Sequence, residues 1–177
     1  MCKAGFTRAS VDHSVFVKES DVGNAMVTIH VDDMVAAISN LETLAHIIAD
    51  LSRIIDIVDM GPIKWFLGIM VTRDHIVHTI SLSQTAYIDT ILKHFHMTNS
   101  HGILTPLDPI MVLSTTMSPT LEEAKQKMKG IPYLTGVGSL MYASMATCPD
   151  ITFATNQLSQ LNSNHGLPHW TALQHVL

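Results

Sequence analysis

Residues 25–38 read AMVTIHVDDMVAAI, and this stretch decides the fold of the first third of the chain. Its first part, Ala25 to Val31, is rich in β-branched residues, and its last part, Met34 to Ile38, is again apolar. Such runs favour strands, and the acidic pair Asp32-Asp33 interrupts them where a turn would lie. The stretch therefore predicts a β-hairpin with an acidic turn.

The segments on both sides of this hairpin predict one further strand and a helix. Upstream, Val11 to Lys18 is a short strand candidate, followed by turn-forming residues at 21–24. Downstream, Ser39 and Glu42 have the spacing of a capping box, so a helix is expected to begin at Ser39. The apolar stripe predicted for this helix comprises Leu41, Leu44, Ala45, Ile48, Leu51 and Ile55.

The second part of the chain predicts a β-hairpin followed by helices. Residues 65–72 and 76–82 are strand candidates, with a turn expected near Arg73-Asp74. Residues 98–118 include Gly102, Pro106 and Pro109 and predict a long loop. Helices are expected from Ser83, from Ser118-Pro119, beyond Ile131 with small residues that permit close packing, around residues 151–161, and from Pro168. The predicted fold class is α+β.

The composition limits the classes of protein that the chain can belong to. Apolar residues make up 47% of the 177 residues, which argues against disorder. Charged residues make up only 14%, against roughly 25% in an average soluble domain, so some of the surface is expected to meet a partner. The formal net charge of −5 argues against a free-standing domain that binds nucleic acid by electrostatics alone.

The same data indicate an intracellular protein, with the choice between cytoplasm and nucleus left open. No apolar run approaches the roughly 18 residues of a membrane span, so no membrane contact is expected. The first ten residues, MCKAGFTRAS, contain no apolar signal-peptide core. The two cysteines, Cys2 and Cys148, provide neither a disulfide framework nor a paired metal-binding spacing.

Asp32 and Asp33 have two interpretations when they are considered alone. An Asp-Asp pair between apolar strands is most often a solvated turn. The functional alternative is a Mg²⁺ site, because magnesium prefers hard oxygen ligands and commonly takes one or two carboxylates together with substrate phosphates. Adjacent side chains on a strand point to opposite faces, so Asp32 is expected to face the metal more directly than Asp33.

Other chemistries find little support in the sequence. Eleven histidines are present, but there is no H-E-x-x-H motif and no CxxC pair, so zinc is not expected. Gly136-Val137-Gly138 lacks the third glycine of a dinucleotide loop and favours helix packing instead. No Ser or Cys lies in a recognisable nucleophile motif.

Seven segments, in this order, resemble the reverse transcriptase of copia-type (Pseudoviridae-like) retrotransposons, and together they span essentially the whole chain. They are GFTRASVDHSVFV at 5–17, TIHVDDM at 28–34, DMGPIKWFLGIMVTRD at 59–74, ISLSQTAYIDTILKHFHM at 80–97, TP at 105–106, YLTGVGSLMYASMATCPDITFATNQLS at 133–159 and HWTALQHVL at 169–177. The resemblance implies a partial right-hand polymerase. Residues 1–82 would be the C-terminal half of the palm, residues 83–164 the helical thumb, and residues 165–177 the start of the connection.

The same resemblance assigns expected roles to individual residues. Asp32 and Asp33 would be the catalytic Asp-Asp pair that holds Mg²⁺, and His30 would contact the primer or nucleotide. Phe66, Leu67 and Gly68 would belong to a primer grip. A packing role is implied for His169. The implied partners are primer–template RNA/DNA and the rest of a Pol polyprotein.

Three departures from the family pattern suggest that the chain alone is inactive. The family's further catalytic aspartate would lie before Met1, with the fingers. His30 stands where the family usually has tyrosine, and Cys148 replaces a common arginine. Two hypotheses follow: a fragment of an RNA-directed DNA polymerase that is inactive alone, or a non-catalytic remnant that acts by interaction. The second includes self-association through uncovered apolar surface.

Overall fold

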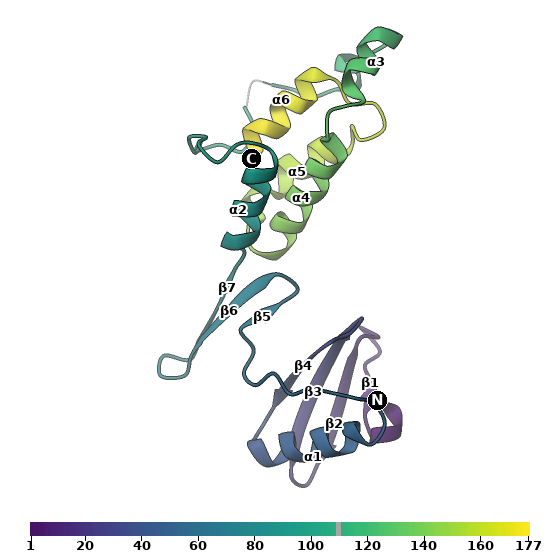
Figure 1. Cartoon of the computed structure of the whole chain (residues 1–177), viewed down its shortest axis with the longest axis vertical. Helices are drawn as coiled ribbons and strands as arrows, with labels where there is room; N and C mark the ends of the chain where they lie inside the picture. Colours follow the sequence, from purple (N-terminus) through teal and green to yellow (C-terminus); the bar gives the residue numbers. More distant parts are fainter. Residues whose placement is uncertain (109–110) are drawn as a thin grey trace. The chain divides into compact units, whose positions relative to one another are not determined.

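The computed structural model has an α+β fold with two antiparallel sheets, as the sequence predicts, and describes residues 1–108 and 111–177 (Figure 1). Pro109, part of the loop expected over residues 98–118, lies outside the described residues. The chain divides into two compact units, Met1–Phe66 and Leu67–Leu177. Six α-helices occur within the described residues, one in the first unit and five in the second.

The first unit is a four-stranded antiparallel sheet with the order β1-β2-β3-β4, and helix α1 lies across it (Figure 1). Its elements are β1 Thr7–Arg8, β2 Val15–Ser20, β3 Gly23–His30, β4 Asp33–Ile38 and α1 Leu41–Ser52, preceded by a 3₁₀ turn at Cys2–Ala4. Val27 on β3 is fully buried and belongs to one apolar cluster with Ile47 and Leu51 of α1. The predicted hairpin at residues 25–38 is therefore confirmed, and it forms half of the sheet.

Helix α1 begins at a different residue and buries a different face from those predicted. The N-cap is Asn40, whose side-chain oxygen accepts a hydrogen bond from the Thr43 N–H at 2.8 Å. Ser39 instead accepts a bond from the Asn24 N–H, so it ties β3 to the end of β4. The buried face consists of Thr43, Ile47 and Leu51, and Leu41 is 83% exposed. The predicted stripe was only partly right: Leu51 is buried, but Leu41 and Ala45 are exposed, because α1 has apolar residues on several faces.

The second sheet has the order β5-β6-β7 and comprises β5 Trp65–Phe66, β6 Ile69–Asp74 and β7 Thr79–Ser83. The continuous strand expected over 65–72 is wrong, because Leu67 and Gly68 have φ values of 51° and 78° and form a turn. The turn expected near Arg73-Asp74 lies instead at residues 75–78. There the Asp74 carboxylate accepts bonds from the backbone N–H groups of Ile76 and Val77.

The remaining helices follow the predicted order with shifted starts. They are α2 Thr85–His94, α3 Glu122–Met128, α4 Tyr133–Ala146, α5 Thr152–Ser159 and α6 Leu167–Val176, with 3₁₀ turns at Thr115–Met117 and Pro149–Ile151. The helix expected from Ser118-Pro119 begins only at Glu122. Ser118 is extended, with φ −75° and ψ 145°, which is the conformation that a following proline favours.

Helices α4, α5 and α6 form the core of the second unit around three fully buried side chains, Tyr133, Leu158 and Leu173. The Tyr133 hydroxyl donates a hydrogen bond to the Leu158 carbonyl at 2.9 Å, and burial raises the pKa of Tyr133 to about 12. Gly136 on α4 lies so close to α6 that an added Cβ would be 2.8 Å from a Leu173 methyl carbon. The small residues of α4 thus permit close helix packing at Gly136, as predicted, but not at Gly138, where nothing lies within 4 Å.

The imidazole of His169 is fully buried at the start of α6, in agreement with the packing role expected for it. Its Nδ1 accepts a hydrogen bond from the Gly166 N–H at 2.9 Å, and its Nε2 lies 3.1 Å from the Ser114 carbonyl. This pair of contacts requires a neutral ring that carries its proton on Nε2. Burial is the main cause of the lowered pKa of His169, and the charge of His165 lowers it further.

The two glycines of α4 give a matched pair of stability predictions. Gly136→Ala should reduce the free energy of unfolding by about 1–3 kcal/mol, because the new methyl group overlaps Leu173. Gly138→Ala should instead raise it by about 0.5–1 kcal/mol, because alanine is the better helix former in open space. Urea unfolding followed by circular dichroism measures both. Equal effects of the two substitutions would contradict this packing.

His169 gives a prediction of pH dependence. A histidine with a lowered folded-state pKa binds its proton more readily after unfolding, so its stabilising contribution is complete above the ordinary pKa of about 6.5 and is lost as the pH falls below it. His169→Gln offers a neutral donor and acceptor that do not titrate. Between about pH 7.5 and about pH 5, the wild-type urea midpoint should therefore fall further than that of the variant. Parallel pH profiles would contradict the neutral-ring assignment.

Candidate functional site

The acidic pair lies at the tip of the β3–β4 hairpin, with its turn one residue earlier than expected. His30 pairs with Asp33 as the last register pair, so Val31 and Asp32 form the two-residue turn and Asp33 is the first residue of β4. The prediction that both aspartates occupy the turn was therefore wrong for Asp33. The structure places His30, Asp32 and Asp33 at the same hairpin tip, at the rim of the sheet, but within the described residues their side chains do not form one metal-binding group.

The turn contains a strained residue. Val31 has a φ of 54° and is 83% exposed. A β-branched side chain rarely adopts this left-handed conformation, and such outliers cost on the order of 1–3 kcal/mol. Two-residue hairpin turns favour Gly, Asn or Asp at positions with positive φ because these residues tolerate it. Ladder pairing from Ala25 to Ile38 holds Val31 in a conformation that the residue itself disfavours.

The Asp32 and Asp33 carboxylates at the tip are both exposed and have no side-chain partner among the described residues. Within the described residues, neither the Asp32 nor the Asp33 side chain makes a hydrogen bond or an ion pair, and no lysine or arginine pairs with their carboxylate oxygens. Two free carboxylates on adjacent residues fit the oxygen donors that Mg²⁺ takes from proteins, where it keeps waters or substrate phosphates in its other positions. The described part of the chain contains no group of three or more His, Cys, Asp or Glu side chains arranged to hold a metal.

The other predicted site residues lie in and beside the β5–β6 turn. Phe66 is the last residue of β5, and Leu67 and Gly68 form the two-residue turn. Both turn residues have positive φ, the pattern of a type I′ hairpin. The Leu67 carbonyl accepts a hydrogen bond from the hydroxyl of Tyr142 on α4. Sequence reasoning missed Tyr142, because nothing in its local pattern distinguishes it from a tyrosine on the surface of a helix.

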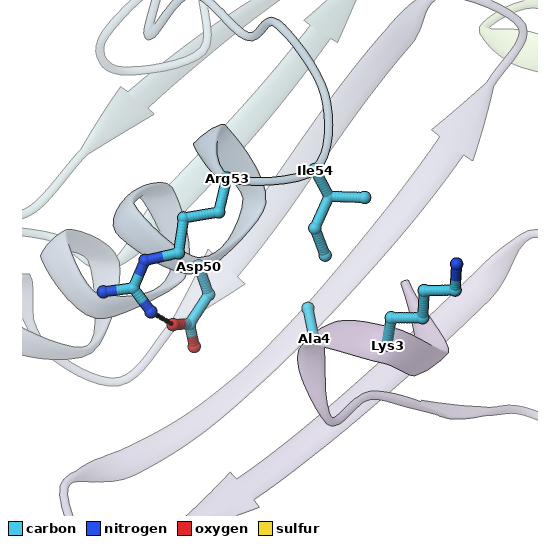
Figure 2. A pocket seen from close by; sticks show the side chains of 5 residues that line it. All are labelled: Lys3, Ala4, Asp50, Arg53 and Ile54. Carbon is cyan, nitrogen blue, oxygen red and sulfur yellow. Dashed lines mark hydrogen bonds and ion pairs between the residues drawn. The ribbon is translucent and has the colours of Figure 1, made fainter.

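A cavity of about 420 Å³ lies elsewhere in the first unit and is lined by Lys3, Ala4, Asp50, Arg53 and Ile54. Figure 2 shows the Arg53 guanidinium turned toward the Asp50 carboxylate, and the two are 3.4 Å apart. The other Asp50 oxygen pairs with Lys18 at 3.0 Å, and this contact is the main cause of the lowered pKa of Asp50. The carboxylate thus already has cationic partners, and the cavity does not include the acidic hairpin tip.

The strain at Val31 predicts a stabilising substitution. Val31→Asn should raise the free energy of unfolding by about 1 kcal/mol, because asparagine tolerates positive φ. Val58→Asn is the matched control, since Val58 is 82% exposed and has no positive φ, and its effect should stay within about 0.5 kcal/mol. Thermal and urea unfolding measure both variants. No difference between the two would show that the Val31 turn is unstrained.

No helix in the described residues is long and apolar enough to cross a membrane. The model of one protein family, described as "Reverse transcriptase (RNA-dependent DNA polymerase)", matches residues 1–109. This match includes the β3–β4 hairpin with Asp32 and Asp33, and the β5–β6 turn with Leu67 and Gly68. No solved structure matches the chain.

Two proteins similar to the chain are Pol polyproteins of plant transposons. The chain is 36% identical over 167 residues to the retrovirus-related Pol polyprotein from transposon TNT 1-94 of Nicotiana tabacum, and 30% identical over 173 residues to that from transposon RE1 of Arabidopsis thaliana. These matches cover 94% and 98% of the chain but only 13% and 11% of the relatives. An uncharacterized mitochondrial protein of Arabidopsis thaliana is 30% identical over 84% of the chain and 58% of its own length. The chain belongs to the reverse transcriptase family and corresponds to a segment of a copia-type retrotransposon Pol polyprotein.

Proposed function

We propose that this chain provides the metal-binding and primer-contacting part of an RNA-directed DNA polymerase. The observation that carries the proposal is the free carboxylate pair Asp32-Asp33 at a hairpin tip, inside the segment that the family model matches. A two-residue turn between paired strands holds these carboxylates at the rim of the sheet.

The proposed chemistry is the attack of a primer 3′-hydroxyl on the α-phosphate of a deoxynucleoside triphosphate. A phosphodiester bond forms, and the bond to the leaving pyrophosphate breaks. Magnesium, when bound, neutralises the charge on the phosphates and on the attacking oxygen. Asp32 and Asp33 would hold it through their carboxylate oxygens. His30, opposite Asp33 in the register, would contact the primer or the nucleotide.

The proposed functional regions are a palm segment at 1–82, a thumb at 83–164 and the start of the connection at 165–177. The concentration of α-helices after Ser83 supports the second region. The compact units divide earlier, between Phe66 and Leu67, so β6 and β7 cluster with the helices rather than with the first sheet. Phe66, Leu67 and Gly68 are proposed to contact the primer, and the turn residues Leu67 and Gly68 belong to the helical unit.

The 177-residue chain by itself should polymerise poorly. The proposed reaction uses a further carboxylate, and the described residues contain no third acidic, histidine or cysteine side chain grouped with Asp32 and Asp33. A missing ligand leaves the cation weakly held and the triphosphate badly positioned. Misplacement by about 1 Å costs on the order of a hundredfold in rate.

Primer extension on a primed RNA template with Mg²⁺ or Mn²⁺ tests the function. The chain alone should give no detectable product, and a fusion to the preceding segment of the tobacco polyprotein should restore synthesis. In that fusion, Asp32→Asn should reduce the rate at least about a hundredfold, because it removes one charged oxygen ligand. Asp12→Asn is the matched control: the Asp12 carboxylate accepts hydrogen bonds only from Ser14, so the rate should be unchanged. Equal rates for the two variants would reject Asp32 as a ligand.

A second candidate function, a non-catalytic interaction fragment, is favoured by one feature of α4. Leu134, Met141 and Met145 form an apolar stripe on the exposed side of the helix, and Met145 is 82% exposed. No charged residue interrupts α4. Concentration-dependent association in sedimentation, together with an inactive fusion, would support this candidate over the polymerase.

A further inference from the structure

The β5–β6 turn is tied to helix α4 by a contact between residues far apart in the sequence. The Tyr142 hydroxyl donates a hydrogen bond to the Leu67 carbonyl oxygen, 75 positions away. A Cβ added to Gly68 would lie 3.7 Å from the same hydroxyl oxygen, so this oxygen lies close to both residues of the turn. All three residues belong to the second unit.

The Leu67 carbonyl has no partner within the hairpin. In a two-residue hairpin the ladder closes at the flanking pair, so the carbonyl of the first turn residue has no acceptor role in the ladder. Leu67 also has a φ of 51°, a conformation that a leucine side chain disfavours. A side-chain hydroxyl from outside the hairpin therefore satisfies a backbone group and holds an otherwise unfavourable turn in one conformation.

A second tyrosine limits the movement of the first. The ring of Tyr87 on α2 meets the Tyr142 ring edge to face, with 4.8 Å between centroids and an 84° interplanar angle. The Tyr87 hydroxyl in turn donates to the Ser139 carbonyl of α4 at 3.2 Å. Two helices thus fix the position of the Tyr142 ring, and the hydroxyl of this ring fixes the turn.

We propose that Tyr142 is a positioning residue that holds the Leu67-Gly68 turn in one conformation against helix α4 through its hydroxyl group. The inference rests on the proposed primer-contacting role of that turn, and it assigns the control of the turn to a helix about 75 residues downstream. The β5–β6 turn and α4 then move together. A primer end held by this turn would therefore be positioned by the second unit.

Hydrogen–deuterium exchange on the 177-residue chain tests whether the Tyr142–Leu67 hydrogen bond holds the turn. Tyr142→Phe removes only the hydroxyl and keeps the ring contact with Tyr87. Backbone amides of residues 66–70 should exchange about tenfold faster in this variant, the loss expected for one hydrogen bond. Tyr87→Phe is the matched control, because its hydroxyl bonds to Ser139 and not to the turn, so exchange at residues 66–70 should not change.

The outcomes separate this proposal from the proposed function. Unchanged exchange at residues 66–70 in Tyr142→Phe would overturn the positioning role of Tyr142. An equal rise in the exchange rates of α5 and α6 would also overturn it, because it would indicate general destabilisation. A DNA primer annealed to an RNA template, added to the wild-type chain, should slow exchange at residues 66–70, and the slowing should be smaller in Tyr142→Phe. If the duplex does not slow exchange at residues 66–70 in the wild type, while Tyr142→Phe still speeds it, the positioning role of Tyr142 holds and the primer-contacting function fails.

Discussion

The antiparallel pairing of β3 with β4 is the constraint on which the proposed metal site depends. Its register runs from Ala25 opposite Ile38 to His30 opposite Asp33. Because side chains alternate between the two faces of a strand, this register places Val27 in the core under α1. A slip by one residue would expose Val27 and move both aspartates relative to the rim. The burial of a single apolar face therefore specifies where two carboxylates lie.

The second unit positions its own turn by a different means. There the β5–β6 turn is held by a side chain of α4, and α4 is held in turn by close packing of Gly136 against Leu173 and by the bond from Tyr133 to Leu158. The first hairpin is specified by its ladder and by the burial of one face, whereas the second depends on contacts that are remote in sequence. The two predicted site segments thus differ in how far local sequence determines them.

This difference explains what the sequence could predict. The apolar run interrupted by Asp32-Asp33 predicted the β3–β4 hairpin, and the later part of the chain predicted its helices in the observed order. The position of the turn was one residue off, because the aspartates favour turns while the register, set by the core, places Val31 there. The continuous strand at 65–72 failed for a similar reason, since Leu67 at positive φ is stabilised by Tyr142 and carries no local turn signal. Residue propensity predicts elements, whereas long-range contacts decide where they end.

One feature of the β3–β4 tip lowers the stability of the folded state, and a second leaves the tip open to cations. Val31 adopts a disfavoured φ, and two adjacent carboxylates lie exposed without a cationic partner in the described part of the chain. The strained turn does not help folding, because glycine or asparagine in place of Val31 would form the same hairpin more easily. A divalent cation held by the two carboxylates would bind the folded tip and would therefore stabilise that state by mass action. Because the strand pairing already holds the turn in one conformation, such binding would require no further ordering of the tip.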